Sequence, residues 1–285
     1  MENENKLQIL IEKAKSGDPN SQLLCGIFLS DTMKRYEEAF SYLQQSAEKE
    51  NVIAQYRVGD CYLNGKGVKK DAQKGFKWLS KAAGRGYADA QLAISTCFFS
   101  ATGVKRSPKS GFEWLMKAAE QGNVKAMNGI GLCYMNGLGT NISYTQAAYW
   151  FEKSVEKGYK TSIMALGDCY AKNGKYEDAF VTYKKAADNG DTKAQLIVAQ
   201  MYQDGKGVDA DEQQTIKYLE KAASLGSEEA VEQLKIIREN QQKVEEYINS
   251  MKKNKSKMPN LGIIFWIIFI VVAILAVLFY QQSNN

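Results

Sequence analysis

Histidine is absent from this chain of 285 residues. The absence excludes Ser/His and Cys/His nucleophile pairs, and it removes the side chain that proteins use most often as a general base and as a metal ligand. Cysteine, aspartate and glutamate remain as possible ligands. The sequence offers no catalytic residue, so we expect a protein that is not an enzyme and that carries no cofactor.

The chain also lacks a dominant charge. Its formal net charge is +5, and basic residues are interleaved with acidic ones along most of its length. This pattern gives little support to nucleic-acid binding. The segments 65–67 and 205–207 read Gly-Lys-Gly, but they lack the longer turn and the Lys-Ser/Thr ending of a P-loop. We therefore expect ordinary loops there and no small-molecule substrate.

A constant interval is present instead. The five cysteines are Cys25, Cys61, Cys97, Cys133 and Cys169, each 36 residues after the one before. A period of about 20–50 residues is typical of repeat proteins. Equivalent positions on stacked helices lie about 8–10 Å apart, which is too far for a disulfide or a shared metal ion. The cysteines are therefore expected to be small buried apolar residues in a reducing compartment.

The first cysteine is expected to break the pattern. An alignment shifted by three residues places Cys25 and Gly26 on Val58 and Gly59. Only the last four cysteines then occupy one position of the repeat.

Each repeat reads as two helices. In the first half, Ala54, Val58 and Cys61 share one helix face. Gly59 within this face predicts a close crossing by a neighbouring helix, because glycine is otherwise costly there. A Gly-x-Gly pair from Gly65 ends the helix.

The second half of each repeat begins at a capping residue. Asp71 is one candidate, and Ser107 followed by Pro108 is a better one. Phe76 and Leu79 then lie on one face of the second helix. A single helical hairpin cannot bury this face, whereas stacked copies can.

These residues resemble the SEL-one-like repeat family, relatives of the tetratricopeptide repeat. The family pattern is roughly A-x-x-x-L-G-x-x-Y-x-x-G-x-G-V, followed by K-A-x-x-W-x-x-K-A-A-x-x-G. The unit 54–86 follows it closely, and the unit ending at Gly190 lacks the Gly-x-Gly-Val loop. The resemblance implies an all-α, right-handed α/α solenoid of about six hairpin repeats, and scaffolding rather than one activity.

The predicted organisation has six parts, of which the second is the array of six repeats. A lead-in helix over 1–13 precedes repeats at 14–51, 52–87, 88–123, 124–159, 160–191 and 192–227, and a capping helix and stalk over 228–251, a basic juxtamembrane linker over 252–260, a transmembrane helix over 261–280 and a short tail over 281–285 follow.

The predicted transmembrane helix has no charged residue, and fifteen of its twenty residues are Leu, Ile, Val or Phe. Twenty residues span about 30 Å, the thickness of the hydrocarbon core. Lysines at 252, 253, 255 and 257 place the preceding side in the cytosol. Met1–Lys6 does not resemble a signal peptide. We expect a tail anchor inserted after translation, in the endoplasmic reticulum rather than the mitochondrial outer membrane, because no basic residues follow the span.

A partner surface is predicted on the first helix of each hairpin, which lines the concave side of a solenoid. It consists of Tyr56, Asp60, Leu63, Asn64, Leu92, Thr96, Phe99, Asn128, Leu132, Met135, Asn136, Met164 and Asp168. Exposed apolar residues in its middle are typical of a binding site, and asparagines can hold a peptide backbone. The alternative is that stacking buries some of these side chains. The regular Lys and Asn pairs of a chaperone-tail clamp are missing.

The leading functional hypothesis is a non-enzymatic adaptor on the cytosolic face of an internal membrane, acting in quality control, degradation or signalling assembly. A tether between organelles is one alternative. The resemblance also implies a second, a cysteine hydrolase of the β-lactamase type, which requires an exposed and activated cysteine. The best-known degradation adaptors of the family place their repeats in the lumen behind a signal peptide, so that role is not carried over.

Overall fold

The computed structural model describes residues 2–254. The predicted transmembrane helix and tail, and the linker from residue 255 onward, lie outside the described residues. The chain divides into two compact units, Met1–Ala222 and Ala223–Asn285, and each is described by itself.

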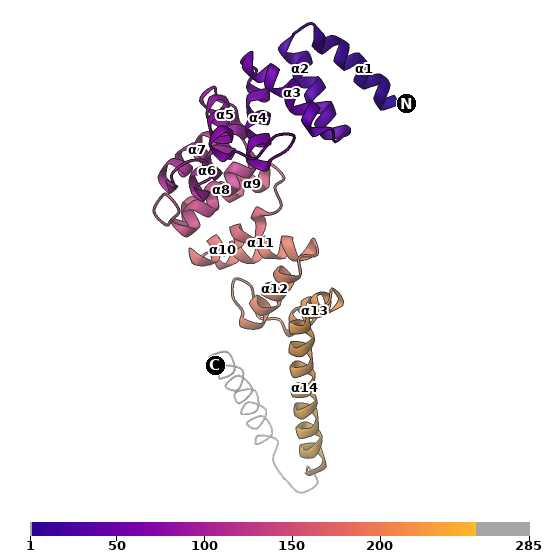
Figure 1. Ribbon diagram of the computed structural model, residues 1–285. Coiled ribbons are helices and arrows are strands. Elements are labelled where there is room, and N and C mark those ends of the chain that lie inside the picture. Colours follow the sequence, from indigo (N-terminus) through magenta and orange to yellow (C-terminus); the bar gives the residue numbers. More distant parts are fainter. Residues whose placement is uncertain (1, 255–285) are drawn as a thin grey trace. The chain divides into compact units, whose positions relative to one another are not determined.

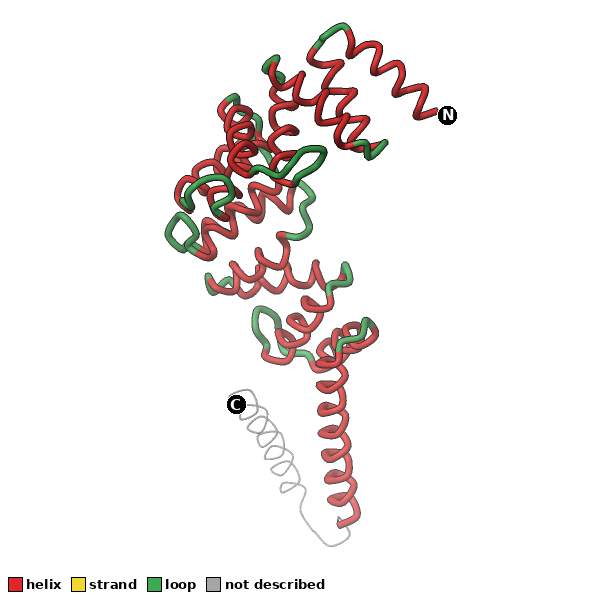
Figure 2. The backbone as a smooth tube through the Cα atoms, viewed as in Figure 1, coloured by secondary structure: helices red, strands yellow, loops and turns green. Residues whose placement is uncertain are grey.

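All regular structure in residues 2–254 is helical (Figures 1 and 2). The helices are α1 (Glu2–Lys15), α2 (Pro19–Ile27), α3 (Tyr36–Glu48), α4 (Val52–Asn64), α5 (Ala72–Gly84), α6 (Ala88–Ser100), α7 (Pro108–Glu120), α8 (Val124–Asn136), α9 (Tyr144–Glu156), α10 (Ser162–Lys172), α11 (Tyr176–Asp188), α12 (Thr192–Asp204), α13 (Glu212–Ser224) and α14 (Glu228–Asn254). A short π-helical segment, η1 (Phe28–Thr32), continues α2. The predicted all-α class is confirmed.

The first unit is a stack of helical hairpins. Helices pair within hairpins as α2 with α3, α4 with α5, α6 with α7, α8 with α9 and α10 with α11, and the second helix of each packs on the first helix of the next. The last hairpin consists of α12 and α13. A hydrogen bond from Thr215 to the carbonyl of Ala199 and stacking of Tyr202 on Tyr218 join its two helices. This arrangement is the predicted α-solenoid.

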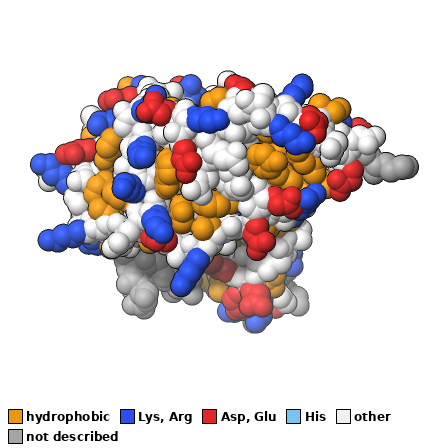
Figure 3. Space-filling model, turned by 45° about the horizontal axis from the view of Figure 1, so that its top comes forward, with side chains coloured by type: hydrophobic (Ala, Val, Ile, Leu, Met, Phe, Trp, Pro, Cys, Tyr) orange, Lys and Arg blue, Asp and Glu red, His pale blue; other side chains and the backbone are white. Residues whose placement is uncertain are grey.

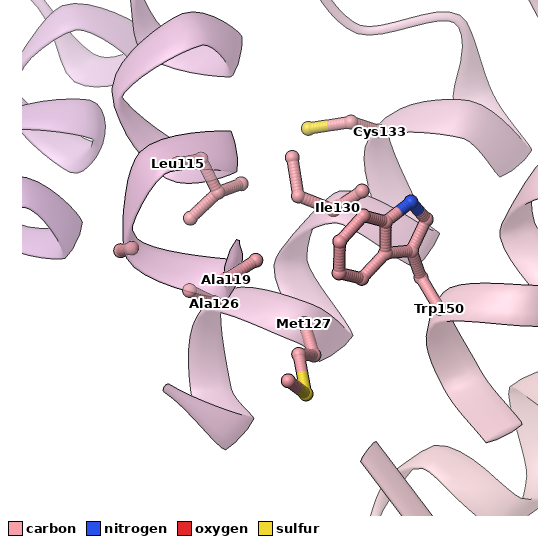
Figure 4. Close-up of a cluster of buried hydrophobic side chains, with 8 residues drawn as sticks. Leu115, Ala119, Ala126, Met127, Ile130, Cys133 and Trp150 are labelled. Atoms are coloured by element: carbon pink, nitrogen blue, oxygen red, sulfur yellow. The ribbon is translucent and has the colours of Figure 1, made fainter. Parts of the chain in front are cut away.

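The interior is a row of small clusters rather than one core. In one of them, Leu115 of α7 packs with Ile130 and Cys133 of α8 and with Trp150 of α9 (Figure 4). Ile130 is fully buried, and burying a side chain of this size stabilises the fold by about 1.5–3 kcal/mol. The cluster at Leu7 joins α1 to the first hairpin, and the other clusters each draw on two successive hairpins, so a hairpin depends on its neighbours for its core.

Side-chain caps begin most of the helices. The side chains of Asp71 and Ser107 accept hydrogen bonds from the backbone amides of Lys74 and Ser110, as predicted. Asn51 does the same for Ala54 at the start of α4. At the other end of α4, Gly65 has φ of 71°, the left-handed cap that glycine adopts readily.

Glycines allow the two helices of a hairpin to approach closely. A Cβ added to Gly59 would lie 2.7 Å from Cγ of Leu79, and one added to Gly167 would lie 2.5 Å from Cε1 of Tyr183. Neither distance leaves room for a side chain. The predicted close crossing at the helical glycines is therefore confirmed.

The glycine that closes the loop inside a hairpin makes a contact between repeats, both in the Gly-x-Gly loop 65–67 and in the corresponding Ala-Thr-Gly loop 101–103. A Cβ on Gly67 would overlap the carbonyl oxygen of Tyr36, and one on Gly103 would overlap that of Ala72. The loop of one hairpin thus lies directly on the first turn of the preceding second helix. The unit ending at Gly190 lacks this loop, and its Gly174 has nothing within 4 Å of an added Cβ.

The second unit contains α14, which runs without interruption over 27 residues. Ser227 caps it by accepting a hydrogen bond from the amide of Ala230, and Ala230 and Leu234 are buried. One helix therefore covers both the predicted capping helix and the predicted stalk. In residues 2–254, no helix combines the length and the apolar composition that a membrane crossing requires.

Candidate partner-binding surface

The five cysteines are free and buried. Burial raises the pKa of the thiols, to about 11 for Cys61 and Cys133 and to about 12 for Cys169. A nucleophilic cysteine needs access and a thiolate at neutral pH, and these thiols have neither. The prediction that they are packing residues is confirmed, and none of them suits a cysteine hydrolase.

The shifted position of Cys25 is also confirmed. A Cβ on Gly26 would lie 2.6 Å from Cγ of Leu43, which repeats the contact of Gly59 with Leu79. Cys25 therefore stands where Val58 stands in the next repeat, and both are fully buried. The first interval of 36 residues is not a structural equivalence.

The predicted partner surface divides by exposure. Its exposed members are Asn64, Thr96, Leu132, Asn136 and Asp168. Its half-buried members are Tyr56, Asp60, Leu63, Leu92, Phe99, Asn128, Met135 and Met164. Leu132 is the one apolar member in the exposed group, with 39% of its surface accessible.

Several of the apolar members pack within the stack. Leu63 lies against the backbone of Gly75, since a Cβ there would be 2.6 Å from its Cδ2. Tyr56 meets Tyr87 edge to face, with ring centroids 5.4 Å apart. Leu92 packs against the cluster shown in Figure 4. These side chains contribute to stacking, as the alternative interpretation of the sequence allows, and only part of each faces outward.

The polar members make hydrogen bonds within the chain. The amide nitrogen of Asn64 donates to the carboxylate of Asp60 at 2.7 Å, and that of Asn136 donates to the carbonyl of Leu132 at 3.0 Å. The carboxylate of Asp168 accepts from the hydroxyl of Tyr183 at 2.5 Å. These hydrogen bonds hold the exposed polar side chains in place through groups of the same helix or, for Asp168, of the helix paired with it.

The second helices carry a repeated contact between a lysine and a tryptophan. Lys81 lies over the ring of Trp78, with Nζ 4.3 Å from the centroid, and Lys117 lies over Trp114 at 4.1 Å. The sequence signal of this contact is the Trp-x-x-Lys spacing at 78–81 and 114–117, which by itself marks the repeat and no surface. Charges of both signs are mixed with apolar side chains on the face shown in Figure 3.

One pocket of about 520 Å³ opens beside this feature. It lies at the C-terminal ends of α3 and α5, and its lining combines Gln55 of α4 with Trp78 and Lys81 of α5 and with Arg85, which follows α5. We call it the Gln55 pocket. No motif pointed to it, because no single segment of the sequence contains it.

Comparisons with known proteins agree with this architecture. The Sel1 repeat model matches residues 22–51, 52–87, 88–123, 124–159, 178–191 and 192–227. A comparison with curated proteins gives no match.

Two solved structures are similar over most of the chain. One is c5321, a protective antigen of uropathogenic Escherichia coli with an SLR fold, at 30% identity and a TM-score of 0.73, covering 81% of this chain and 51% of that one. The chain thus spans about half the length of that protein. The other is a Sel1 repeat protein from Oxalobacter formigenes, at 31% identity and a TM-score of 0.63, covering 75% of this chain and 86% of that one.

Proposed function

The chain belongs to the Sel1 repeat family, whose members are protein-interaction scaffolds, and from that premise we propose that it recruits protein partners to the cytosolic face of a membrane. The observation that carries the proposal is the repeated display of one position on the first helices. Thr96, Leu132 and Asp168 occur at intervals of 36 residues, and all three are exposed. A partner segment laid along the stack would meet them in turn.

The membrane part of the proposal is supported by composition. Residues 261–280 are uncharged and rich in Leu, Ile, Val and Phe, which suits a span of the hydrocarbon core. Four lysines between 252 and 257 precede the span, and lysine-rich flanks stay in the cytosol. The strongly apolar span favours the membrane of the endoplasmic reticulum, where an adaptor would serve quality control, degradation or signalling assembly.

Proximity labelling from the amino terminus of the full chain tests the scaffold role. The paired substitutions Thr96→Glu and Leu132→Glu change two exposed positions of the predicted partner surface, and we expect them to remove specific partners from the labelled set. The reason is that buried apolar contacts and unmatched charges decide most interface energies.

The matched control is the pair Lys77→Glu and Glu113→Lys, which alters exposed charges on the second helices. We expect it to keep the partners. Identical labelled sets for both pairs would contradict the proposed surface. Partners anchored in an opposing membrane would indicate a tether instead of an adaptor.

A further inference from the structure

Gln55 is a buried side chain with an unused acceptor. Only 4% of its surface is exposed, and its Nε2 donates to the carbonyl of Ala47 at 3.4 Å. This bond orients the amide, and the same bond recurs from Gln91 to Ala83 and from Gln195 to Ala187. The Oε1 atom of Gln55 accepts no hydrogen bond from any of residues 2–254. A buried acceptor without a donor is unfavourable, so a group that enters the pocket with a donor is stabilised there.

The neighbouring repeat shows which group fits. Gln91 is the residue 36 positions after Gln55, and its Oε1 accepts a hydrogen bond at 2.7 Å from the carboxamide of Gln121. Gln121 is in turn 36 positions after Arg85. In the preceding repeat, the equivalent Gln22 donates from its Nε2 to the carboxamide oxygen of Gln45 at 3.0 Å, and its own Oε1, like that of Gln55, accepts no hydrogen bond from residues 2–254. The repeat of Gln91 therefore shows a carboxamide completing this buried acceptor.

Arg85 leaves the position open in the repeat between them. Its guanidinium donates to the carbonyl of Glu50 at 2.6 Å and pairs with the Glu50 carboxylate at 3.3 Å. Both bonds hold the side chain toward the turn after α3. The Gln55 pocket is lined by this arginine in the place where the next repeat has a glutamine.

The remaining lining favours a neutral polar group. Lys81 and Arg85 contribute two positive charges to the pocket, and Glu48 and Glu50 contribute two negative charges, so neither a carboxylate nor an ammonium gains a net attraction. The indole of Trp78 also lines the pocket. The ammonium of Lys81 covers one face of this ring, so a planar amide can contact only the rest of the ring. The volume of about 520 Å³ lies within the range of about 300–1,000 Å³ that is usual for small-ligand sites.

We propose that the Gln55 pocket binds the side-chain carboxamide of a glutamine or asparagine in a protein partner, with the amide donating to Oε1 of Gln55. The site is distinct from the predicted partner surface, because none of its lining residues belongs to that surface. Only the peptide source of the ligand rests on the proposed function.

The test uses the full chain in detergent micelles with ¹⁵N-labelled tryptophan indoles, and Trp78→Phe assigns the signal of Trp78. The probe is N-acetyl-glutamine methylamide. The comparison is N-acetyl-methionine methylamide, which is similar in size but has no carboxamide in its side chain. We expect a saturable shift of the Trp78 signal with the glutamine compound alone, and unmoved signals from Trp114 and Trp150. Equal shifts with both compounds, or no shift with either, would overturn the proposal. Tighter binding of free L-glutamine would overturn the peptide source.

Gln55→Met removes the acceptor at a position where the chain already tolerates methionine. Met127 stands 72 residues after Gln55, at the equivalent point of a later repeat, and is buried. We expect the variant to fold and to bind the glutamine compound at least several-fold more weakly. Unchanged affinity would contradict the role of Gln55.

Arg85→Gln copies the arrangement of the next repeat. We expect the new carboxamide to fill the pocket, to abolish the shift of Trp78 and to raise Tm by about 2–4 °C, since one buried acceptor gains a donor. Retained probe binding would overturn the proposed geometry. The pocket experiments do not test the scaffold role. That role is tested separately by the Thr96 and Leu132 substitutions.

Discussion

Single positions in the repeat show which backbone conformations the fold requires. The first helices α4, α8 and α12 end at Gly65, Gly137 and Gly205, each with a positive φ. The helix α6 ends in the same conformation at Ala101, with φ of 57°. An L-residue with a Cβ reaches this region only at a cost, so Ala101 keeps the geometry of the repeat without the residue that suits it.

Replacing Ala101 with glycine is expected to raise the free energy of unfolding by about 0.5–1 kcal/mol. Ala101 is exposed, so little packing is lost with its methyl group. Urea unfolding of the full chain in detergent measures the change. Ala171→Gly in the last turn of α10 is the control, and it is expected to lower stability by up to about 1 kcal/mol because glycine weakens a helix. A loss of stability in both variants would contradict the cap argument.

The buried thiols predict a dependence of stability on pH. Burial raises the pKa of Cys133 from 9.0 to about 11 in the folded chain. Unfolding returns the pKa to its ordinary value, so this contribution to stability is complete below pH 9 and is lost as the pH rises through about 11. We expect the urea midpoint to fall over that window.

Cys133→Met isolates the thiol from the tyrosines and lysines that titrate in the same range. Met201 occupies the corresponding place in the last repeat and is buried, so the substitution should be accommodated. We expect a smaller fall of the midpoint in this variant than in the unaltered chain. Identical falls would show that Cys133 contributes nothing to the pH dependence.

Among the elements, the loops that contain Gly67, Gly103, Gly139 and Gly207 bring the backbones of neighbouring hairpins into contact. Gly103 has φ of 71° and lies against the first turn of α5, where a Cβ would overlap the carbonyl oxygen of Ala72. Gly174 has a similar φ of 75° but an open surrounding. An alanine at either position would strain the backbone, but only at Gly103 would it also overlap a neighbouring hairpin. Comparing the two substitutions therefore separates the free energy of backbone strain from that of steric overlap.

Gly103→Ala is expected to lower the free energy of unfolding by more than about 2 kcal/mol, because strain in the backbone adds to a steric overlap. Gly174→Ala should cost only the conformational part, about 1 kcal/mol. Urea unfolding of both variants gives the comparison. Equal losses would show that the loops do not join neighbouring hairpins.

Most of the helix ends and helix crossings were predictable from the sequence. Capping residues, helical glycines and the Gly-x-Gly ends are local signals, and Asp71, Gly59 and Gly65 act as expected. The π-helical segment η1 was not predictable, because Phe28–Thr32 has no distinctive residue that widens a helix. The Gln55 pocket was not predictable either. It depends on the direction taken by one exposed arginine, Arg85, and exposed side chains are not fixed by periodicity.

For the whole molecule, the proposed membrane anchor predicts on which side of the membrane the repeats lie. Lysines precede residues 261–280, so the repeats should face the cytosol. We expect added protease to digest the repeats on sealed microsomes that carry the full chain, and to leave a small fragment that contains the span.

Replacing Lys252, Lys253, Lys255 and Lys257 with glutamine tests whether these lysines set the orientation in the membrane. We expect mixed orientations, because the charge bias that sets topology is then removed. Repeats shielded from protease in the unaltered chain would contradict the cytosolic assignment.

The packing of each hairpin on the hairpins beside it in sequence has a consequence for the rate of folding. Nearly all contacts in the first unit join segments that follow one another along the chain, and proteins with such local contacts fold quickly because little loop-closure entropy is lost before contacts form. The slow step is the first pair of hairpins, since an isolated hairpin has no complete core. Later hairpins add to a surface that already exists. Folding can therefore begin on the ribosome and proceed in the order of synthesis.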